Sequence, residues 1–505
     1  MSGIRPEPER DPFDAALLAN VRPSTYRNPK PENAYNLVVI GAGPAGLVAA
    51  AGAAGLGAKV ALIEREVLGG DCLFAGCVPS KALIRCARAA ADAALDGSLG
   101  LNAAPPTVDF PRVMERMRRL RAQISANDSV QRFTGLGIDV FLGDGKFAGG
   151  NCVEVAGETL RFSRALIATG SSPVVPEIPG LKASGFDTNL TIFDLRERPE
   201  SLLVLGGGAI GCELAQAFQR LGTRVTVLES FSRLMARDDA DAAECVRASL
   251  VRDGVSVQLN ASVLKVARGP DGRRVVTYEQ EGQKKEVGGA RVLVATGRKP
   301  QLSGLNLNAA GVESDANGVV TDDFLRTSNA RIYAAGDVCS KYKFTHAADA
   351  MARIVLRNAL FFGRSRVSKL VIPWATYTDP EVAQAGWTAQ AAESAGVATD
   401  VFTVQMKDVD RAILDGQTAG FGRLVLKKGT GTLLGATLVA PHAGDMIGEI
   451  ALVMTAGLKA GMLSSTILPY PTAGEIWRRL GDSFNRTRLT PRTKSFLTTL
   501  LSIRR

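Results

Sequence analysis

The stretch NLVVIGAGPAG, residues 36–46, decides the fold. An apolar run typical of a buried strand leads into Gly41, Gly43 and Gly46, and an alanine-rich run that favours a helix over 47–56 follows. A second apolar run, KVALIE, then ends at Glu64. Glycines in G-x-G-x-x-G spacing between a strand and a helix, with an acid about twenty residues later, indicate a dinucleotide-binding unit.

The same arrangement returns in SLLVLGGGAIG, residues 201–211, with Gly206, Gly208 and Gly211. Its second strand, RVTVLE, ends at Glu229. Glycines let the backbone approach a pyrophosphate, and the helix N-terminus supplies unpaired N–H groups. The carboxylate that ends each second strand accepts hydrogen bonds from ribose hydroxyls. Two complete copies therefore predict two dinucleotide sites.

Three further segments are typical of strands that return beneath bound nucleotides. ALIATG (165–170) and VLVATG (292–297) each end at a small-residue turn, and IYAAGD (332–337) ends in an acid. Strands alternating with helices predict an α/β fold with parallel sheets. After about residue 368 no dinucleotide motif appears, and short strands accompany an apolar helical segment over 446–460. We expect an α+β domain there.

Composition places the chain among globular proteins of several domains. Its 505 residues are too many for one core, and 46% hydrophobic with 22% charged residues is ordinary. Seven cysteines are too few for a disulfide framework, and the N-terminus lacks the apolar core of a signal peptide. We therefore expect a cytoplasmic protein.

The charge is concentrated at one end of the chain. Residues 476–505 hold eight Lys/Arg and one acid, Asp482, out of a net charge of +10. This distribution predicts a basic tail rather than a basic fold, and argues against nucleic acid as a partner. At the other end, residues 1–35 contain six prolines and five charges of each sign, which predicts an extended arm.

Two cysteines stand out in GGDCLFAGCVPSK, residues 69–81. Cys72 and Cys77 are separated by four residues, too many for a C-x-x-C redox pair. A helix that starts near Pro79 would place Cys77 at its N-terminus, where a thiolate is stabilised. The other cysteines lack such a setting and are expected to be inert packing residues: Cys86, Cys152, Cys212, Cys245 and Cys339.

From Asn36 to Glu475 the chain resembles the flavin-dependent pyridine nucleotide–disulfide oxidoreductases, which include dihydrolipoamide dehydrogenase, glutathione reductase and mercuric reductase. The resemblance implies an α/β fold with two Rossmann-like dinucleotide-binding domains, for FAD and NAD(P), and a C-terminal α+β dimerisation domain. The implied boundaries are an arm (1–35), a discontinuous FAD domain (36–187 and 300–368), an NAD(P) domain (188–299), an interface domain (369–475) and the basic tail (476–505).

The resemblance also implies the cofactor-binding residues. FAD would lie on the first glycine motif, and the nicotinamide cofactor on the second. The full cofactor-binding set is Gly41, Gly43, Gly46, Glu64, Gly70, Lys81, Gly145, Thr169, Gly170, Ser171, Gly206, Gly208, Gly211, Glu229, Val263, Gly297, Gly336, Asp337 and His346. An acid at 229 favours NADH because it repels a 2′-phosphate, while the nearby Arg233 leaves NADPH open.

By the same resemblance, Cys77 is the flavin-proximal sulfur and Cys72 the exchanging one. Lys81 lies near the flavin, with Glu213 as its ion-pair partner. Electrons pass from the nicotinamide through FAD to the Cys72–Cys77 disulfide. An acceptor is then reduced at the subunit interface of a homodimer, near Tyr470 and Glu475.

The segment LPYPTAGE (468–475) departs from the thiol-reducing members, which carry a histidine where Tyr470 stands. A tyrosine, with a pKa of about 10, is a poor base at neutral pH. Mercuric reductases also have tyrosine here, and TYTDPEVA (376–383) looks closest to that branch. No cysteine follows Cys339, so that branch's C-terminal cysteine pair is absent. We expect a metal ion or another soft acceptor, and no resident metal.

Two alternatives remain open at this point. One is a thiol–disulfide reductase of the dihydrolipoamide dehydrogenase or glutathione reductase kind. The other, of a different class, is a low-turnover redox-sensing or membrane-docked interaction flavoprotein. Its basis is the missing histidine and the tail, where basic residues flank four apolar ones and could give weak contact with a membrane surface: Phe496, Leu497, Leu500 and Leu501.

Overall fold

The computed structural model describes residues 11–94, 100 and 107–504. The chain divides into two compact units. The first comprises the chain up to Gly206 together with Ala217–Leu228 and Ser262–Leu370, and the second comprises Gly207–Gln216, Glu229–Ala261 and the chain from Val371. Residues of the expected NAD(P) domain fall in both units, so the predicted domain boundaries stay a prediction.

The main sheet of the first unit is built on the strand that opens with the first glycine motif. Its order is β3-β2-β1-β6-β5-β4, with β18 pairing β6. The parallel strands are β1 (Tyr35–Ile40), β2 (Val60–Glu64), β3 (Asp139–Leu142), β6 (Glu158–Ile167) and β18 (Ile332–Ala334), and the antiparallel extension is β4 (Lys146–Gly149) and β5 (Cys152–Val155). Leu37, Val38 and Val39 are fully buried, as expected of a parallel strand covered on both faces.

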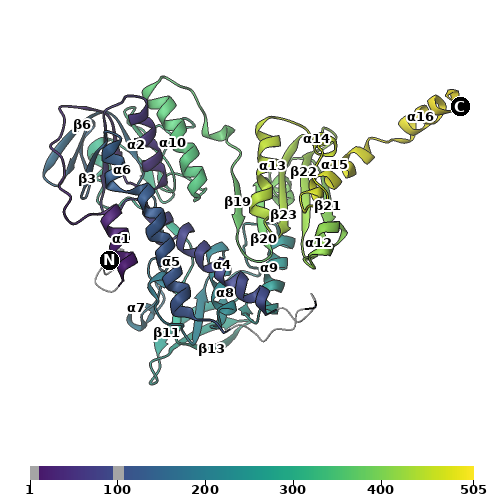
Figure 1. Cartoon of the computed structure of the whole chain (residues 1–505), viewed down its shortest axis with the longest axis horizontal. Coiled ribbons are helices and arrows are strands. Elements are labelled where there is room, and N and C mark those ends of the chain that lie inside the picture. The colour runs from purple at the N-terminus through teal and green to yellow at the C-terminus, as the bar shows by residue number, and fades with distance from the viewer. Residues whose placement is uncertain (1–10, 95–99, 101–106, 505) are drawn as a thin grey trace. The chain divides into compact units, whose positions relative to one another are not determined.

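Two helices lie side by side on this sheet, α2 (Pro44–Gly55) and α10 (Thr345–Leu360) (Figure 1). A Cβ at Gly52 of α2 would lie 2.5 Å from a methyl carbon of Leu356 in α10, so glycine lets the two helices approach closely. The sequence places the start of α2 at 47, but it begins at Pro44, since proline suits the first helical position.

A second set of parallel strands carries the second glycine motif: β8 (Ser201–Leu205), β9 (Arg224–Leu228) and β14 (Arg291–Val294), with β8 in the middle. Helix α8 (Ala209–Arg220) follows β8. Between β9 and β14 in the sequence, three strands form an antiparallel sheet: β11 (Ser262–Arg268), β12 (Arg274–Gln280) and β13 (Gln283–Gly289). Smaller elements are α7 (Leu181–Ser184), α9 (Ala240–Arg252), β10 (Ser256–Gln258), β7 (Ser171–Pro173), β15 (Arg298–Pro300), β16 (Ser314–Asp315) and β17 (Gly318–Val319).

The C-terminal part of the second unit is an antiparallel sheet of order β19-β20-β23-β22-β21. Its strands are β19 (Pro373–Thr376), β20 (Glu381–Gly386), β21 (Thr399–Gln405), β22 (Phe421–Lys427) and β23 (Leu433–Ala440). The accompanying helices are α11 (Ala389–Ser394), α12 (Asp410–Leu414), α13 (Ala443–Thr455), α14 (Gly461–Ser465), α15 (Glu475–Thr487) and α16 (Pro491–Ile503). The α+β character expected after residue 368 is what the structure shows.

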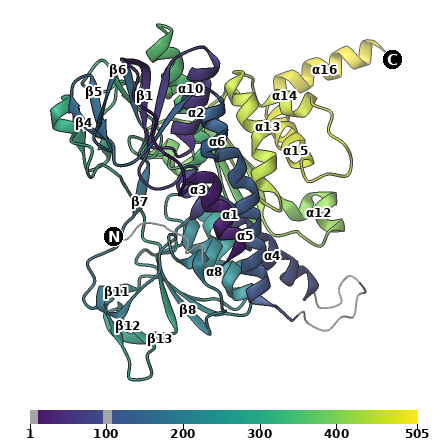
Figure 2. The same cartoon turned by 60° about the vertical axis from the view of Figure 1, so that its left-hand side comes forward.

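The N-terminal segment is not the extended arm that its prolines predict. Residues Pro12–Val21 form helix α1, with Leu17 and Val21 fully buried. Asp11 caps the helix by accepting the N–H of Phe13 at 2.8 Å. Figure 2 shows α1 beside helix α5 (Phe110–Ser125), with α3 (Gly70–Phe74) and α4 (Cys77–Ala93) close to α5. Helix α6 (Val130–Gly135) completes this region.

The solvated basic tail also begins later than residue 476. Helix α15 buries Ile476, Trp477 and Leu480 against the C-terminal sheet, so it belongs to that core. Helix α16, by contrast, has no buried residue. Among the described residues, no helix has the length and apolar character needed to cross a bilayer.

Candidate functional site

The first glycine loop has the geometry that a dinucleotide requires. Gly41 has φ +105°, and a Cβ there would lie 2.4 Å from the carbonyl oxygen of Ala168, at the end of the returning β6. A Cβ at Gly46 would lie 1.8 Å from the carbonyl oxygen of Gly41. Both positions therefore admit only glycine.

The loop also leaves the space that FAD would need. Gly43 is the N-cap residue of α2 and offers no side-chain hydrogen bond to the first turn, and a Cβ at Gly43 would meet nothing within 4 Å. The start of α2 is therefore open beside Gly43, and the first N–H groups of a helix lack partners within it, as a pyrophosphate site requires. The residues present fit the cofactor.

Glu64 closes this loop from the next strand. Its two carboxylate oxygens accept the backbone N–H groups of Ala42 and Glu66, each at 2.7 Å. Burial raises the pKa of Glu64, against the effect of these hydrogen bonds. Each oxygen keeps a lone pair for a ribose hydroxyl.

The second loop repeats this arrangement. Gly206 has φ +105°, and a Cβ there would lie 2.6 Å from the carbonyl oxygen of Ala295, which follows β14. Glu229 accepts the N–H of Gly207 at 2.6 Å and that of Phe231 at 2.9 Å. The echo between ALIATG and VLVATG is thus explained, since each segment supplies the carbonyl that a glycine must approach.

The two cysteines lie beside the first loop. The N–H of Gly69 donates to the carbonyl of Ala42 at 2.9 Å, and a Cβ at Gly70 would lie 2.9 Å from Cα of Gly43. Cys72 follows in α3, half-buried, and Cys77 is exposed. The backbone thus holds the cysteine segment against the expected pyrophosphate site.

Cys77 is the first residue of α4, two residues earlier than the sequence places the start of this helix. Its Sγ lies 3.4 Å from Oγ1 of Thr345, at the start of α10. A hydrogen bond to Cys77 and burial raise the pKa of the Cys72 thiol, while the hydroxyl of Thr345 opposes them. Thr345 is therefore a functional candidate that the sequence reasoning missed, although it directly precedes His346, a predicted cofactor residue.

A polar cluster joins the cysteine segment to the late acidic motif. Oγ of Ser171 donates to Asp337 at 2.6 Å, and Nε of Arg298 donates to Oγ of Ser171 at 2.8 Å. Arg298 also pairs with Asp71, the residue before Cys72. Arg298 and Asp71 were not predicted, because no spacing rule links residues 227 positions apart.

The remaining predicted cofactor residues differ in their surroundings. Thr169 donates to the carbonyl of Gln301 at 2.7 Å, and the ring of His346 stacks on that of Phe344 with centroids 5.5 Å apart. A Cβ at Gly170 or Gly297 would meet open space. A Cβ at Gly336 would lie 3.3 Å from Cβ of Ala348, and one at Gly145 would lie 3.0 Å from Ile63. Val263 lies in β11, with no described contact to the second loop.

Lys81 and Glu213 belong to different units. Lys81 lies half-buried one turn after Cys77 in α4. Glu213 is buried in α8 and accepts the N–H of Tyr377 at 2.8 Å. Their predicted pairing stays a prediction.

Tyr470 hydrogen-bonds to an aspartate that the sequence reasoning did not single out. Its hydroxyl donates to Oδ2 of Asp410 at 2.9 Å, and this bond raises the pKa of Tyr470. Arg479 bridges Asp410, at 3.1 Å, and Glu475, at 3.6 Å. Glu475 is buried and also pairs with Arg478 at 2.6 Å. The interface candidates therefore form one charged network.

Comparison with known proteins adds the family. The pyridine nucleotide-disulphide oxidoreductase model matches residues 35–352, and the model of that family's dimerisation domain matches residues 372–480. A mercuric reductase of Bacillus cereus is 36% identical over 442 residues, covering 87% of this chain and 70% of the relative. A dihydrolipoyl dehydrogenase of Geobacillus stearothermophilus is 34% identical, covering 87% of this chain and 94% of the relative.

A solved structure shares the fold as well. The HOCl-induced flavoprotein disulfide reductase RclA from Escherichia coli matches with a TM-score of 0.79 at 29% identity, covering 89% of this chain and 99% of RclA. RclA has also been solved as a Cu(II) complex. With the two glycine loops and the cysteine segment in place, these matches show that the chain belongs to the pyridine nucleotide-disulphide oxidoreductase family, as an enzyme that uses FAD and NAD(P)H.

Proposed function

We propose that this enzyme reduces a soft acceptor, in the manner of a mercuric reductase, through a redox-active Cys72–Cys77 disulfide. The observation that carries the proposal is the packing of the cysteine segment on the first glycine loop, where Gly69 donates to Ala42 and Gly70 lies against Gly43. A redox pair must lie beside the flavin to exchange electrons with it, and this contact supports such a position.

The bound cofactors supply hydride transfer from NAD(P)H and a two-electron relay to sulfur. The protein's part is to tune the two thiols. A hydrogen bond to Cys77 and burial raise the pKa of Cys72 and so favour the protonated form of that thiol. Cys77 is the first residue of α4, where a helix N-terminus stabilises a thiolate, and its Sγ lies 3.4 Å from Oγ1 of Thr345. This setting supports the proposal that Cys77 is the flavin-proximal sulfur and Cys72 the exchanging one.

The second loop supports NADH as the hydride donor. Glu229 follows β9, where an acid in this motif accepts from a ribose and repels a 2′-phosphate. The guanidinium of Arg233 bonds to the backbone of its own turn. It donates to the backbone carbonyls of Asp238 at 2.9 Å and Ala236 at 2.7 Å. Repulsion between Glu229 and a 2′-phosphate then makes NADPH bind less tightly than NADH.

The acceptor proposal rests on Tyr470 and on the relatives. Asp410 raises the pKa of Tyr470 and keeps its proton in place, so this side chain donates a hydrogen bond rather than acting as a base. A reductase of disulfides must protonate a leaving thiolate, whereas reduction of a soft metal ion needs no such step. Two thiols reduce Hg(II) to Hg(0) as the disulfide re-forms and both thiol protons are released. A mercuric reductase among the relatives and the Cu(II) complex of RclA support a soft metal.

We propose that the enzyme works as a homodimer, in which Tyr470 and Glu475 serve the acceptor site of the partner subunit. The match of residues 372–480 to the dimerisation domain supports this. Apolar side chains exposed on this domain support it too. They are Ile413 (55% exposed), Leu414 (67%), Leu452 (69%) and Ile467 (95%).

An anaerobic titration with NADH, followed by a panel of acceptors, tests the proposal. We expect a long-wavelength thiolate–flavin absorption band on two-electron reduction, absent in Cys77→Ala, and faster turnover with Hg(II) than with lipoamide or glutathione disulfide. Faster turnover with a disulfide would establish the dihydrolipoamide dehydrogenase-like alternative. A band that survives in Cys77→Ala would overturn the assignment of Cys77.

The third possibility, a low-turnover sensing or membrane-docked protein, depends on the tail. Helix α16 exposes Phe496 (68%), Leu501 (62%) and Ile503 (77%), but no comparison supports contact with a membrane. Deletion of residues 491–505 tests this possibility. Rapid NADH oxidation that is unchanged by the deletion would exclude this possibility.

A further inference from the structure

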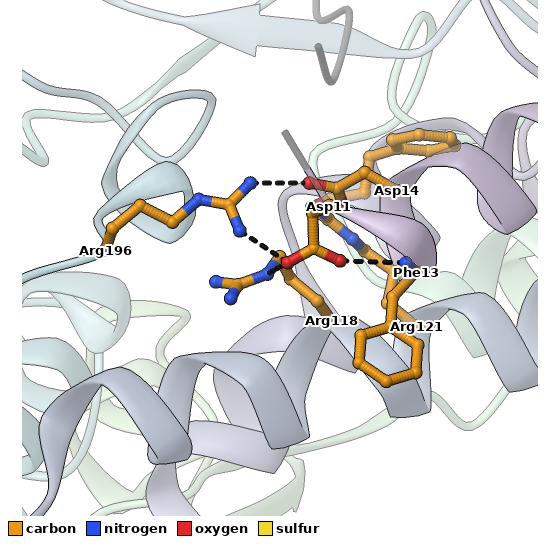
Figure 3. Close-up of polar contacts among 7 residues, drawn as sticks. Asp11, Phe13, Asp14, Arg118, Arg121 and Arg196 are labelled. Carbon is orange, nitrogen blue, oxygen red and sulfur yellow. Dashed lines mark hydrogen bonds and ion pairs between the residues drawn. The ribbon is translucent and has the colours of Figure 1, made fainter. Parts of the chain in front are cut away.

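Helix α1 brings two buried carboxylates against helix α5 (Figure 3). Asp11 accepts from Nε of Arg118 at 2.6 Å and from Arg196 at 2.5 Å. Asp14 accepts from Arg121 at 2.8 Å and from the other nitrogen of Arg196 at 2.9 Å. The side chains of Asp11 and Asp14 are 7% and 4% exposed, so these bonds form away from bulk water.

The cluster fixes α1 on the body of the first unit. Burial would raise the pKa of Asp11, but the N–H of Phe13 and the guanidinium groups of Arg196 and Arg118 outweigh it and hold that pKa below its ordinary value. Removing one partner of a buried ion pair leaves the other charge uncompensated. The cluster consists of two pairs, Asp11 with Arg118 and Asp14 with Arg121, and Arg196 bonds to both aspartates.

Arg121 connects this cluster to the cysteine segment. It is 2% exposed, and while Nη2 pairs with Asp14, Nη1 donates to the carbonyl oxygen of Phe74 at 3.0 Å. Its guanidinium carbon lies 5.9 Å from the centroid of the Phe74 ring. Phe74 is the last residue of α3 and lies between Cys72 and Cys77. The last carbonyls of a helix lack partners within it, and Arg121 supplies one.

The same short segment is held at two other points. Nδ2 of Asn189 donates to the carbonyl of Ala75 at 3.1 Å, and Arg298 pairs with the side chain of Asp71. A disulfide tolerates only a narrow range of separation and orientation between its two residues. The path of the backbone from Cys72 to Cys77 therefore sets the ease of forming the bond, and Arg121 holds the middle of that path.

We propose that Arg121 is a positioning residue for the Cys72–Cys77 pair, and that Asp14 of the N-terminal helix aligns it. The inference rests on the proposed redox role of the two cysteines. Asp14 of α1 binds Nη2 of Arg121, which leaves Nη1 directed at the carbonyl oxygen of Phe74. The N-terminal helix thereby contributes to the position of the cysteine segment. The planar fork of arginine reaches both partners, and a lysine cannot.

The test measures the thiol–disulfide equilibrium of the full-length protein in glutathione redox buffers, read by alkylation and mass spectrometry. Arg121→Met and Arg121→Lys remove the bond to Phe74, and Asp14→Asn removes the ion pair between Asp14 and Arg121. We expect the equilibrium constant of Cys72–Cys77 to shift about tenfold in Arg121→Met. Arg121→Lys restores the charge but not the fork and stays shifted, and Asp14→Asn moves in the same direction by a smaller amount.

Two arginines of the same helix provide the controls. Arg118→Met breaks an ion pair of the cluster without touching Phe74, and Arg119→Met changes an exposed side chain. We expect Arg118→Met to lower the melting temperature and to keep the wild-type thiol–disulfide equilibrium. If Arg121→Met does not fold, Arg121→Lys and Asp14→Asn decide. Wild-type equilibria in all folded variants of Arg121 and Asp14 would overturn the inference. A wild-type protein that forms no Cys72–Cys77 disulfide would instead overturn the proposed function.

Discussion

The two glycine loops of this chain are built alike. In each, the first glycine has φ +105° and approaches a carbonyl of a returning strand. In each, a glutamate accepts the N–H of the middle residue of the loop and the N–H two residues beyond itself. The carbonyl of that middle residue accepts a further N–H at 2.9 Å, from Gly69 in the first loop and from Met235 in the second.

The two loops differ in the segment that donates this N–H to the middle residue. In the first loop it continues from Gly69 into Cys72 and Cys77. In the second it belongs to a turn whose Leu234 covers Gly207. The loop itself is thus a general device for holding a dinucleotide, and only in the first loop does the segment that packs on its middle residue carry two cysteines.

The largest expected effect separates the two loops by cofactor. Gly41→Ala and Gly206→Ala each force a side chain into a left-handed conformation and against a backbone carbonyl. The strain alone costs about 1–3 kcal/mol. We expect Gly41→Ala to be purified without FAD, and Gly206→Ala to keep its FAD but to lose reduction by NADH. Flavin absorbance per chain and stopped-flow reduction measure the two effects.

Gly55→Ala is the matched control for these variants. Gly55 lies at the end of α2, and a Cβ there meets nothing within 4 Å. This variant should keep both cofactors. Full flavin content in Gly41→Ala would show that the first loop does not hold FAD.

The next effect concerns the two glutamates. Glu64→Gln and Glu229→Gln preserve shape but replace one hydrogen-bond acceptor of each carboxylate by an amide donor. A hydrogen bond to a charged group contributes about 1.5–3 kcal/mol, so we expect at least about a tenfold loss of affinity. Glu64→Gln should weaken FAD alone, and Glu229→Gln should raise the KM for NADH while improving the relative use of NADPH. Equal losses of NADH and NADPH in Glu229→Gln would contradict the role of Glu229 in cofactor choice.

The loops could be predicted because all their determinants lie close together in the sequence. The spacing of glycines and the acid about twenty residues later specify the strand, the turn and the helix. Thr345 and Arg298 were not predicted as site residues, because the residues they contact, Cys77 and Asp71, lie 268 and 227 positions away. Such pairs form only in the folded chain, and no local pattern of residues indicates them.

The two ends of the chain were misjudged for another reason. Their composition predicted an extended arm at the proline-rich end and a basic tail from residue 476 at the other, but local signals favoured helices packed on the body. Asp11 followed by Pro12 is an N-cap with proline at the first helical position. Ile476, Leu480 and Phe484 share one face of a helix, and all three are buried. Periodicity and capping were the better guides at both ends.

A third prediction uses the pH dependence of the first loop. Burial raises the pKa of Glu64, so its carboxylate takes up a proton at a higher pH than an ordinary glutamate does. Ribose hydroxyls donate to the charged form, so FAD binding favours deprotonation. FAD affinity should therefore fall as the pH falls through this raised pKa, by at most about tenfold per pH unit. FAD dissociation followed by fluorescence measures it. Glu64→Gln should remove this pH dependence, and an equal slope in that variant would assign it to another group.

The smallest expected effect exchanges the middle residues, Ala42 and Gly207. A Cβ at Gly207 would lie 2.4 Å from Cδ2 of Leu234 and 3.1 Å from Oε2 of Glu229. The end of a leucine side chain can move, so Gly207→Ala should cost about 1 kcal/mol, or about a fivefold loss of NADH affinity. Ala42→Gly adds only backbone freedom, about 0.5–1 kcal/mol, and should leave Cys72 and Cys77 reactive. The double variant Gly207→Ala/Leu234→Ala separates the causes. Recovery of NADH affinity there would show that Leu234 alone excludes a side chain from the second loop. Continued weak binding of NADH would show that the added methyl group conflicts with Glu229, the counterpart of Glu64 in the first loop.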